Sequence, residues 1–388
     1  MKRTGIMLAA FGLFLFVQTA QADWTTIKRI TWTSGGSYAQ ALAIDSNDAI
    51  HVVWVDTTPG DPQIFYRKST NGGATWSGAK QLTWTSSDMR FPAIAIDSND
   101  NIHVAWEDWW DWEIYYRRST DGGSTWTQTK RLTWTWTSSD NPALATGTDS
   151  NIHFVWSEKI YPAINNSEIF YKRSTNWGST WSSTQTQKLI ARPGISSDPA
   201  IAVDSNNFVH VAWVEDSYGS EIFYKRSTDG GTTWRALREL TTTSGVYSVM
   251  PAMATGSNNT VHLVWADSEA GNKEIYYMRS SNRGASWSAA KRLSWTPVES
   301  IVPNIAVDSS NTIHVVWFDQ ASSPNFIQIL YMSSTDGGTT WNTPEELTWY
   351  SGTFYEYLDL GPDIAVDSAD NIYVLWNEAG DIYYMKSK

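Results

Sequence analysis

The sequence predicts an all-β protein, a seven-bladed β-propeller of four-stranded blades in which the N-terminal strand closes the last blade. Two observations lead to this fold class. Each repeat can be divided into four short strands separated by turns, and such units with a period of 40–55 residues are typical of propeller blades. The phrase IHVAW also recurs in seven related copies, spaced 50 to 59 residues apart, which end at Trp54, Trp106, Trp156, Trp213, Trp265, Trp317 and Trp376. We number the repeats 1 to 7 by these tryptophans.

Repeat 2 shows the expected elements in order. The segment PAIAID at 92–97 is the first strand, and the following DSNDN supplies Asp and Asn for a tight turn. IHVAW at 102–106 and EIYYRRS at 113–119 are the second and third strands, because both are rich in alternating or β-branched residues. The turn STDGGSTW at 119–126 leads to the fourth strand, KRLTW, at 130–134.

The two ends of the chain predict how the propeller closes. Repeat 7 stops at YYMKSK, after its third strand, whereas the segment DWTTIKRITWT at 23–33 matches the fourth-strand phrase of repeat 2. We therefore expect the N-terminal strand to complete the last blade, which leaves no open sheet edge. Residues 1–22 have a basic start, an apolar run and a small-residue cleavage site, which predicts a signal peptide and a single propeller domain at 23–388.

The composition limits the classes of partner. The chain has 388 residues, no cysteine and a formal net charge of −12, so disulfides are excluded and nucleic acid is not expected as a ligand. Beyond the signal peptide there is no apolar run long enough to span a membrane. We expect a secreted or periplasmic, extracellular-type monomer with no cofactor. No residue pattern supports a metal, although a structural or ligand-bridging Ca²⁺ is compatible with the acidic loops.

The glycine-rich turn carries a family resemblance. The pattern S-x-D-x-G-x-x-W occurs at 119–126, 227–234 and 334–341, and three further copies have Asn71, Asn176 or Asn282 in place of Asp. This motif is the Asp-box, or bacterial neuraminidase repeat, and the chain resembles the sialidase-like Asp-box propellers. The resemblance implies that the turns join the third and fourth strands on the face opposite the active site.

Elementary chemistry gives the turn a structural role. The carboxylate accepts backbone N–H groups, the glycine adopts a positive φ, and the tryptophan buries a large apolar surface. We assign this role to Asp121, Gly123, Trp126, Asp229, Trp234, Asp336 and Trp341. The histidines of the second strands, one in each of six repeats, are likewise interpreted as structural, because they are spread too widely to share an ion.

The opposite face is built by the loops between strands two and three and by the connections between repeats. An acidic residue lies two positions after each core tryptophan, and most third strands begin with another. These rings either pair with Arg67, Arg117, Lys172 and Lys225 or face solvent, and the alternative is a cation or polyhydroxyl site.

The loop EDWWDWE at 107–113 is the main candidate ligand site. Its aromatic rings and carboxylates are suited to stacking on a sugar and to hydrogen bonding with its hydroxyls. We predict ligand contacts by Trp109, Trp110, Trp112, Asp108, Asp111 and Arg90. The alternative is that the rings pack between loops. The recurrent fourth-strand tryptophans, among them Trp32, Trp84, Trp134 and Trp295, are interpreted instead as blade packing.

A sialidase would require an arginine triad that binds the substrate carboxylate. The phrase Met89-Arg90-Phe91-Pro92 resembles the [FY]-R-I-P phrase of that family and departs from it at two positions. Arg192 is a second loop arginine, and no third is evident. The family's sialidases are six-bladed, whereas this chain has seven repeats.

Three hypotheses follow. The first is a binding protein for glycan or another extracellular ligand, without turnover. The second is a carbohydrate-active enzyme, either a glycoside hydrolase such as an exo-sialidase or a polysaccharide lyase. Its catalytic candidates are Arg90, Arg192, Asp108 and Glu158. It predicts carboxylates with shifted pKa values in a pocket around the two arginines. The third is a cell-envelope scaffold with a flat face for protein partners.

Overall fold

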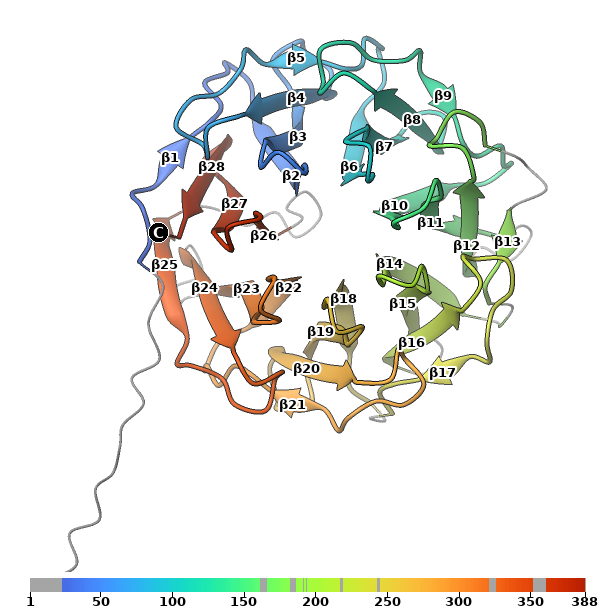
Figure 1. The fold of residues 1–388 in the computed structure, drawn as a ribbon, viewed down its shortest axis with the longest axis vertical. Helices are drawn as coiled ribbons and strands as arrows, with labels where there is room; N and C mark the ends of the chain where they lie inside the picture. Colours follow the sequence, from blue (N-terminus) through green and yellow to red (C-terminus); the bar gives the residue numbers. More distant parts are fainter. Residues whose placement is uncertain are drawn as a thin grey trace, which may run out of the picture.

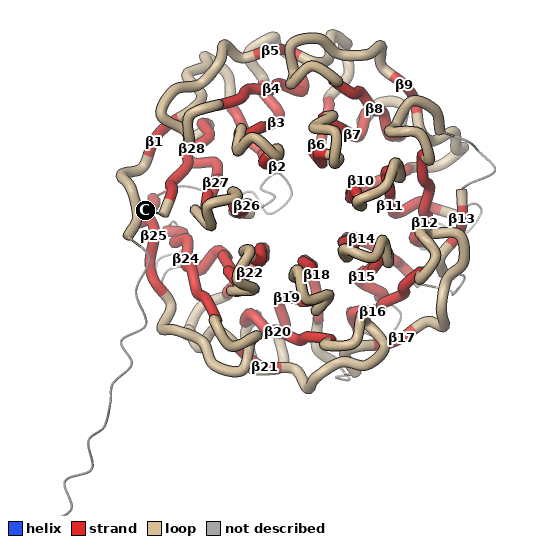
Figure 2. Tube along the Cα trace, viewed as in Figure 1, coloured by secondary structure: helices blue, strands red, loops and turns tan. Residues whose placement is uncertain are grey.

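The computed structural model describes residues 23–160, 166–181, 186–190, 192, 194–216, 219–242, 245–320, 326–351 and 361–387. The described part consists of strands, turns and loops and contains no helix, as Figure 2 shows. The all-β prediction is confirmed. The expected signal peptide at 1–22 lies outside the described residues.

Each repeat contributes four strands, and the bounds follow the sequence pattern closely. The first strands are β2 (Ser37–Ile44), β6 (Met89–Ile96), β10 (Ser139–Thr146), β14 (Ile195–Val203), β18 (Ser248–Thr255), β22 (Ser300–Val307) and β26 (Asp363–Val366). The second strands are β3 (Ile50–Asp56), β7 (Ile102–Asp108), β11 (Ile152–Lys159), β15 (Val209–Asp216), β19 (Val261–Asp267), β23 (Ile313–Gln320) and β27 (Ile372–Glu378).

The third strands are β4 (Gln63–Ser69), β8 (Glu113–Ser119), β12 (Ser167–Ser174), β16 (Ser220–Ser227), β20 (Glu274–Ser280), β24 (Phe326–Ser334) and β28 (Asp381–Lys386). The fourth strands are β5 (Lys80–Gln81), β9 (Lys130–Arg131), β13 (Gln187–Lys188), β17 (Arg238–Glu239), β21 (Lys291–Arg292), β25 (Glu345–Ser351) and β1 (Lys28–Arg29). Most fourth strands are only two residues long, so the outer edge of each sheet is short.

Antiparallel pairing joins the strands of each repeat in sequence order. Repeats 1, 2, 5 and 6 each form a four-stranded sheet. Repeats 3 and 4 share an eight-stranded sheet, because a single parallel bridge joins Ser167 to Ile195. In repeat 7, β1 pairs with β28, with Lys28 opposite Tyr384. Figure 1 shows the sheets around a common axis, with the first strands innermost and β1 beside β28.

A bulge shapes the first strand of most repeats. The pairing of first and second strands shifts between the second and fifth residues, for example between Arg90 and Ala93. The residue inside the bulge has a positive φ, as Phe91, Asn141 and Asp198 do. A bulge of this kind turns a side chain away from the regular alternation. The bulge therefore fixes the direction of the two adjacent side chains near the start of each bulged first strand, such as Arg90 and Phe91 in β6.

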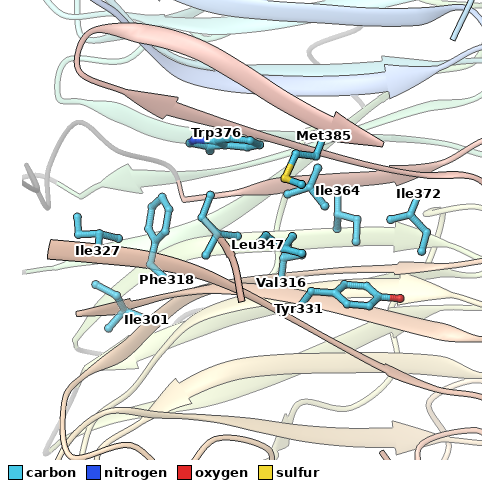
Figure 3. Packing of buried hydrophobic residues seen from close by; sticks show 12 residues of the cluster. Ile301, Val316, Phe318, Ile327, Tyr331, Leu347, Ile364, Ile372, Trp376 and Met385 are labelled. Atoms are coloured by element: carbon cyan, nitrogen blue, oxygen red, sulfur yellow. The ribbon is translucent and has the colours of Figure 1, made fainter. Parts of the chain in front are cut away.

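The hydrophobic core lies between neighbouring sheets. The core tryptophans of all seven repeats are at most 2% exposed. Figure 3 shows the cluster between repeats 6 and 7, where Trp376 and Met385 lie above Val316 and Tyr331. Trp24 packs edge-on against Tyr331, with 5.1 Å between ring centroids. The N-terminal segment thus supplies repeat 7 with an Asp-box-like tryptophan as well as a strand.

Candidate functional site

The Asp-box turns are held by hydrogen bonds to one carboxylate. In repeat 2, Asp121 accepts from the Ser119 hydroxyl at 2.8 Å and from the backbone N–H of Thr125 at 2.8 Å. The Thr125 hydroxyl donates to the other carboxylate oxygen at 2.6 Å, and these bonds lower the pKa of Asp121 to about 2. Asp229 and Asp336 make the corresponding bonds in repeats 4 and 6. Both oxygens of this carboxylate are used inside the turn.

The glycine and tryptophan of each turn contact the preceding repeat. Gly123 has a φ of +81°, and a Cβ added there would lie 2.1 Å from the hydroxyl of Tyr66. Trp126 packs edge-on against the same tyrosine ring at 5.1 Å. Trp234 and Trp341 contact Tyr171 and Tyr277 in the same way. The turns therefore connect successive repeats, and we call the end of the molecule that carries them the Asp-box face.

The histidines of the second strands lie inside the sheets near this face. His103 Nδ1 contacts the Tyr116 hydroxyl at 2.7 Å, and its Nε2 contacts Asp97 at 3.0 Å. Burial lowers the pKa of His103 and holds the ring neutral. Within the described ranges, no three His, Asp or Glu side chains are grouped so that they could hold a metal ion.

The opposite end, which we call the loop face, carries the two predicted rings of acids, and most of these carboxylates have internal partners. Asp319 accepts from the indole N–H of Trp317 at 2.9 Å and from the Ser300 hydroxyl at 2.5 Å. Glu158 accepts from the indole of its own repeat, Trp156, at 2.9 Å, and burial raises its pKa. Four of the acids that begin third strands pair with fourth-strand cations, as Glu113 does with Arg131 at 2.7 Å.

The predicted partners of these acids were wrong. Three of the four cations named from the sequence bind backbone carbonyls instead, as Lys172 donates to Leu132 at 2.7 Å and Lys225 to Leu189 at 2.6 Å. The reason is their register. These side chains lie in the middle of the third strand, whereas the acids lie at its beginning.

The aromatic loop packs onto Arg90. The guanidinium of Arg90 lies 3.6 Å from the ring centroid of Trp109, whose ring is 4.1 Å from that of Trp112. The Lys159 ammonium lies over the ring of Trp112, 5.5 Å from the ring centroid. Trp109 and Trp112 are half-buried in this cation–aromatic stack, whereas Trp110 is 70% exposed.

The carboxylates of the loop have different positions. Asp108 is buried and accepts from the Ser87 hydroxyl and the backbone N–H of Trp110. It therefore holds the loop in shape. Asp111 is exposed and accepts from the Tyr115 hydroxyl at 2.5 Å. Of the predicted ligand residues, Trp110 and Asp111 are exposed, and the side chain of Arg90 is 25% exposed.

Glu107 is a candidate that the sequence reasoning missed. It pairs with Arg90 across β6 and β7, so the two side chains share one face of the sheet. Glu107 is 1% exposed, and its Oε2 has no hydrogen-bond partner among the described residues. Burial, with a smaller effect of Asp140, raises its pKa to about 8, whereas Arg90 opposes that rise.

Two further carboxylates, Asp140 and Asp198, lie at the bulges of the next two first strands, β10 and β14. Burial raises the pKa of Asp140 and of Asp198. The Asn141 amide donates to Asp198 at 2.6 Å and links repeats 3 and 4. Repeats 2 to 4 therefore each place a carboxyl group with a raised pKa near the start of the inner strands, and Glu107 is the one beside Arg90.

The corresponding positions of repeats 5 and 6 are apolar. Val249 and Met250 stand at the bulge of β18, and Ile301 and Val302 at that of β22. Glu107 also stands out when the residue that directly follows each core tryptophan is compared across the seven repeats. The other repeats have Val55, Ser157, Val214, Ala266, Phe318 and Asn377 there. Only repeat 2 has a charged residue at this position, and this difference is the sequence signal that could have identified Glu107.

Arg192 lies elsewhere. Its guanidinium is 5.2 Å from the ring centroid of Phe223, and its side chain is exposed. No contact among the described residues brings it to Arg90. The two predicted arginines are therefore not brought into one site among the described residues.

The similarities to known proteins agree with the repeat fold. Residues 197–386 match the family described as BNR repeat-containing family member. No curated protein matches the sequence.

Several solved structures are similar over most of the chain. An ulvan lyase, a polysaccharide lyase bound to -[GlcA(1-4)Rha3S]-, has a TM-score of 0.62 at 10% identity, covering 92% of this chain and 95% of its own. A Hadza microbial sialidase has a TM-score of 0.53 at 13% identity, with coverages of 88% and 73%. An α-L-arabinanase of Penicillium chrysogenum, complexed with arabinobiose, has a TM-score of 0.52 at 17% identity, with coverages of 77% and 93%.

These identities are low, so the likeness to solved structures concerns the fold. The described ranges contain no helix with the length and hydropathy needed to cross a bilayer. Residues 197–386, with their Asp-box turns, are thus similar to the BNR repeat-containing family, and the chain shares its fold with the solved sialidase.

Proposed function

We propose that the protein binds a glycan or another extracellular ligand through the loop face of repeats 2 to 4, without turnover. The observation that carries the proposal is the stack of Arg90 on Trp109 and Trp112, with Trp110 exposed beside it. The stack occurs where the repeat pattern is interrupted, and divergent loops of repeat proteins are where binding surfaces belong.

The chemistry of this surface suits a polyhydroxylated ligand. The ring of Trp110 can stack on the apolar face of a sugar, and Asp111 can accept from hydroxyl groups. Arg90 is held by the ring of Trp109 and by an ion pair with Asp88 at 3.9 Å, so its other N–H groups can bind an oxygen-rich group at low entropic cost. The polysaccharide and arabinobiose named for the similar structures support a carbohydrate ligand.

A carbohydrate-active enzyme is the second candidate, either a glycoside hydrolase such as an exo-sialidase or a polysaccharide lyase. Glu107 favours it, because a carboxyl group with a pKa of about 8 retains its proton at neutral pH and can act as a general acid. Arg90, directly opposite, would bind the substrate. The third candidate, a cell-envelope scaffold, is favoured only by the exposed Trp110.

The organisation of the chain belongs to the same proposal. We take each of the seven repeats as one blade of a single propeller at 23–388. The pairing of β1 with β28 supports closure of the ring, as do the two hydrogen bonds from Ser368 to Asp48. Residues 1–22 would be a signal peptide, and the product a secreted or periplasmic monomer that needs no metal or cofactor.

The test is a glycan array probed with the protein and with the Arg90→Ala and Trp110→Ala variants. We expect binding to a defined glycan that both substitutions reduce at least tenfold. The glycan identified is then incubated with the protein and with Glu107→Gln, and product is followed by chromatography. Product formation that Glu107→Gln abolishes would replace the binding proposal with the enzyme. A blank array would favour the scaffold.

A further inference from the structure

The fourth-strand tryptophans are exposed at the outer rim, and the prediction that they pack inside the blades was wrong. Trp32 and Trp84 are each 65% exposed, Trp134 is 68% exposed, and Trp295 is 65% exposed. They follow strands of only two residues, so no neighbouring strand covers them. The repeat period indicates that these tryptophans are structurally equivalent. It does not indicate whether a side chain beside a short edge strand is buried or exposed to solvent.

Three of these rings lie beside a cation of the next repeat. Arg67 lies 5.7 Å from the ring centroid of Trp32, Arg117 lies 5.3 Å from Trp84, and Lys172 lies 5.5 Å from Trp134. The pairs occupy three consecutive junctions, between repeats 7 and 1, 1 and 2, and 2 and 3.

The charges of these cations are not neutralised locally. Arg67 donates to the backbone carbonyls of Ile30 and Ser77, and Lys172 donates to the carbonyl of Leu132. Arg117 donates to the hydroxyl of Thr129. Burial lowers the pKa of each of the three, as expected for cations without a carboxylate partner.

The junction between repeats 7 and 1 also contains a cavity of about 450 Å³. Trp32 and the Asp-box turn at 73–76 line it, together with Lys28, Arg29 and Arg67, and no carboxylate is among its lining residues. Arg29 is paired with Asp381 at 2.6 Å, whereas Lys28 is exposed. In repeats 1 and 2 the residues equivalent to Lys28 bind the neighbouring Asp-box backbone, as Lys80 binds Ser124. The cavity at Trp32 is thus a positively charged recess in a chain of net charge −12.

We propose that the outer rim of repeats 7, 1 and 2 is a second carbohydrate site, which binds an acidic polysaccharide along Trp32, Trp84 and Trp134. One anionic sugar residue occupies the cavity at Trp32, where Lys28 and Arg67 face its carboxylate or sulfate group. The indole ring supports the apolar face of the sugar. The next two tryptophans repeat this contact, so the affinity gains from multivalency.

The pattern favours an acidic polysaccharide over other anionic polymers. A nucleic acid would need a broad positive surface to offset repulsion from the acidic protein, whereas here the cations lie beside tryptophans at three separate junctions. The site is independent of the proposed function, because it lies at the rim and shares no residue with the Arg90 stack.

The repeat architecture supplies a matched control in Trp295. It has the same position and the same exposure as Trp32, but its ring lies over Arg292, which is paired with Glu274 at 2.7 Å. The next repeat has Met332 where Arg67 stands. Trp295 is therefore an exposed rim tryptophan beside a neutralised cation.

The experiment measures binding of the purified protein to polygalacturonate, dextran sulfate and neutral dextran by isothermal titration calorimetry. We expect micromolar or tighter binding to at least one acidic polymer, affinity that rises with polymer length, and weakening in high salt. Trp32→Ala and Lys28→Gln should each weaken binding about tenfold, whereas Trp295→Ala should change it less than twofold. Thermal unfolding of each variant checks that the fold is intact, which is expected because these side chains are exposed.

Several results would overturn the proposal. These are the absence of binding to both acidic polymers, equal binding to neutral dextran, or equal losses from Trp32→Ala and Trp295→Ala. Tighter binding to single-stranded oligothymidylate than to either polymer would assign the rim to nucleic acid instead. Because Trp32→Ala and Lys28→Gln change no residue of the Arg90 stack, failure at the rim is distinguishable from failure of the proposed function.

Discussion

The two faces of the molecule use the same repeats in different ways. On the Asp-box face, the contacts of Asp121, Gly123 and Trp126 recur in other repeats with the same partners and similar distances. On the loop face, the equivalent inner positions hold Arg90 in one repeat and Asp140 in the next. The comparison shows that repeated contacts stabilise the fold, whereas the positions at which repeats differ carry the chemistry.

The largest effect is expected where a repeated contact is broken. Gly73 has a φ of +78°, and a Cβ there would lie 2.2 Å from the hydroxyl of Tyr384. Gly73→Ala should therefore lower the free energy of unfolding by about 3 kcal/mol, through backbone strain and overpacking. Urea denaturation measures the loss.

The same turn region offers a control in Gly78, which has an ordinary φ and no heavy atom within 4 Å of the position that a Cβ would take. Gly78→Ala should change stability by less than about 0.5 kcal/mol. Equal effects at the two glycines would contradict the assignment of the Asp-box turns to stability.

The second prediction concerns the unrepeated carboxyl group. Above its ordinary pKa of 4.5, Glu107 loses its proton in the unfolded chain but keeps it in the folded protein until about pH 8. The group therefore reduces stability progressively as the pH rises from 4.5 to 8. Glu107→Gln should raise the free energy of unfolding by about 2 kcal/mol at about pH 8 and by almost nothing at about pH 4. Urea denaturation at the two pH values measures the difference.

Asp108, the next residue, is the contrasting case. It accepts from the Ser87 hydroxyl and from two backbone N–H groups, of Trp110 and Asp111. Asp108→Ala should lower stability by about 1–2 kcal/mol, because all three donors lose the Oδ1 acceptor that they share. If Glu107→Gln were instead destabilising near pH 8, Glu107 would be a structural residue like its neighbour.

The sequence predicted the regular features well and the irregular ones poorly, for physical reasons. The Asp-box turns, the four strands of each repeat and the pairing of β1 followed from local chemistry and periodicity. Glu107 was missed because it lies within a strand whose neighbours are all buried. The exposure of Trp32 depends on how little of the outer edge each short fourth strand covers, and residue spacing does not encode that.

The smallest expected effect lies within the Asp-box face, where two repeats lack one of the recurring contact partners. Gly147 and Gly256 stand where repeat 2 has Asp97, and the Nε2 atoms of His153 and His262 have no hydrogen-bond partner among the described residues. Burial lowers the pKa of His153 to about 3 and that of His262 to about 4. Both side chains are held neutral without a carboxylate to support a proton.

This difference should appear in the pH dependence of stability. Below pH 6.5 the unfolded chain takes up a proton at His262, whereas the folded protein does not until about pH 4, so stability falls as the pH falls through this range. His262→Gln should make the slope of unfolding free energy against pH shallower by about 1 kcal/mol per pH unit between about pH 6.5 and 4.5. His103→Gln should change that slope less, because Asp97 favours the protonated form of His103 and opposes the lowering of its pKa. Slopes that change equally would mean that the Asp97 contact contributes nothing to the charge state of the ring, and that the repeats of this face are equivalent despite the two glycines.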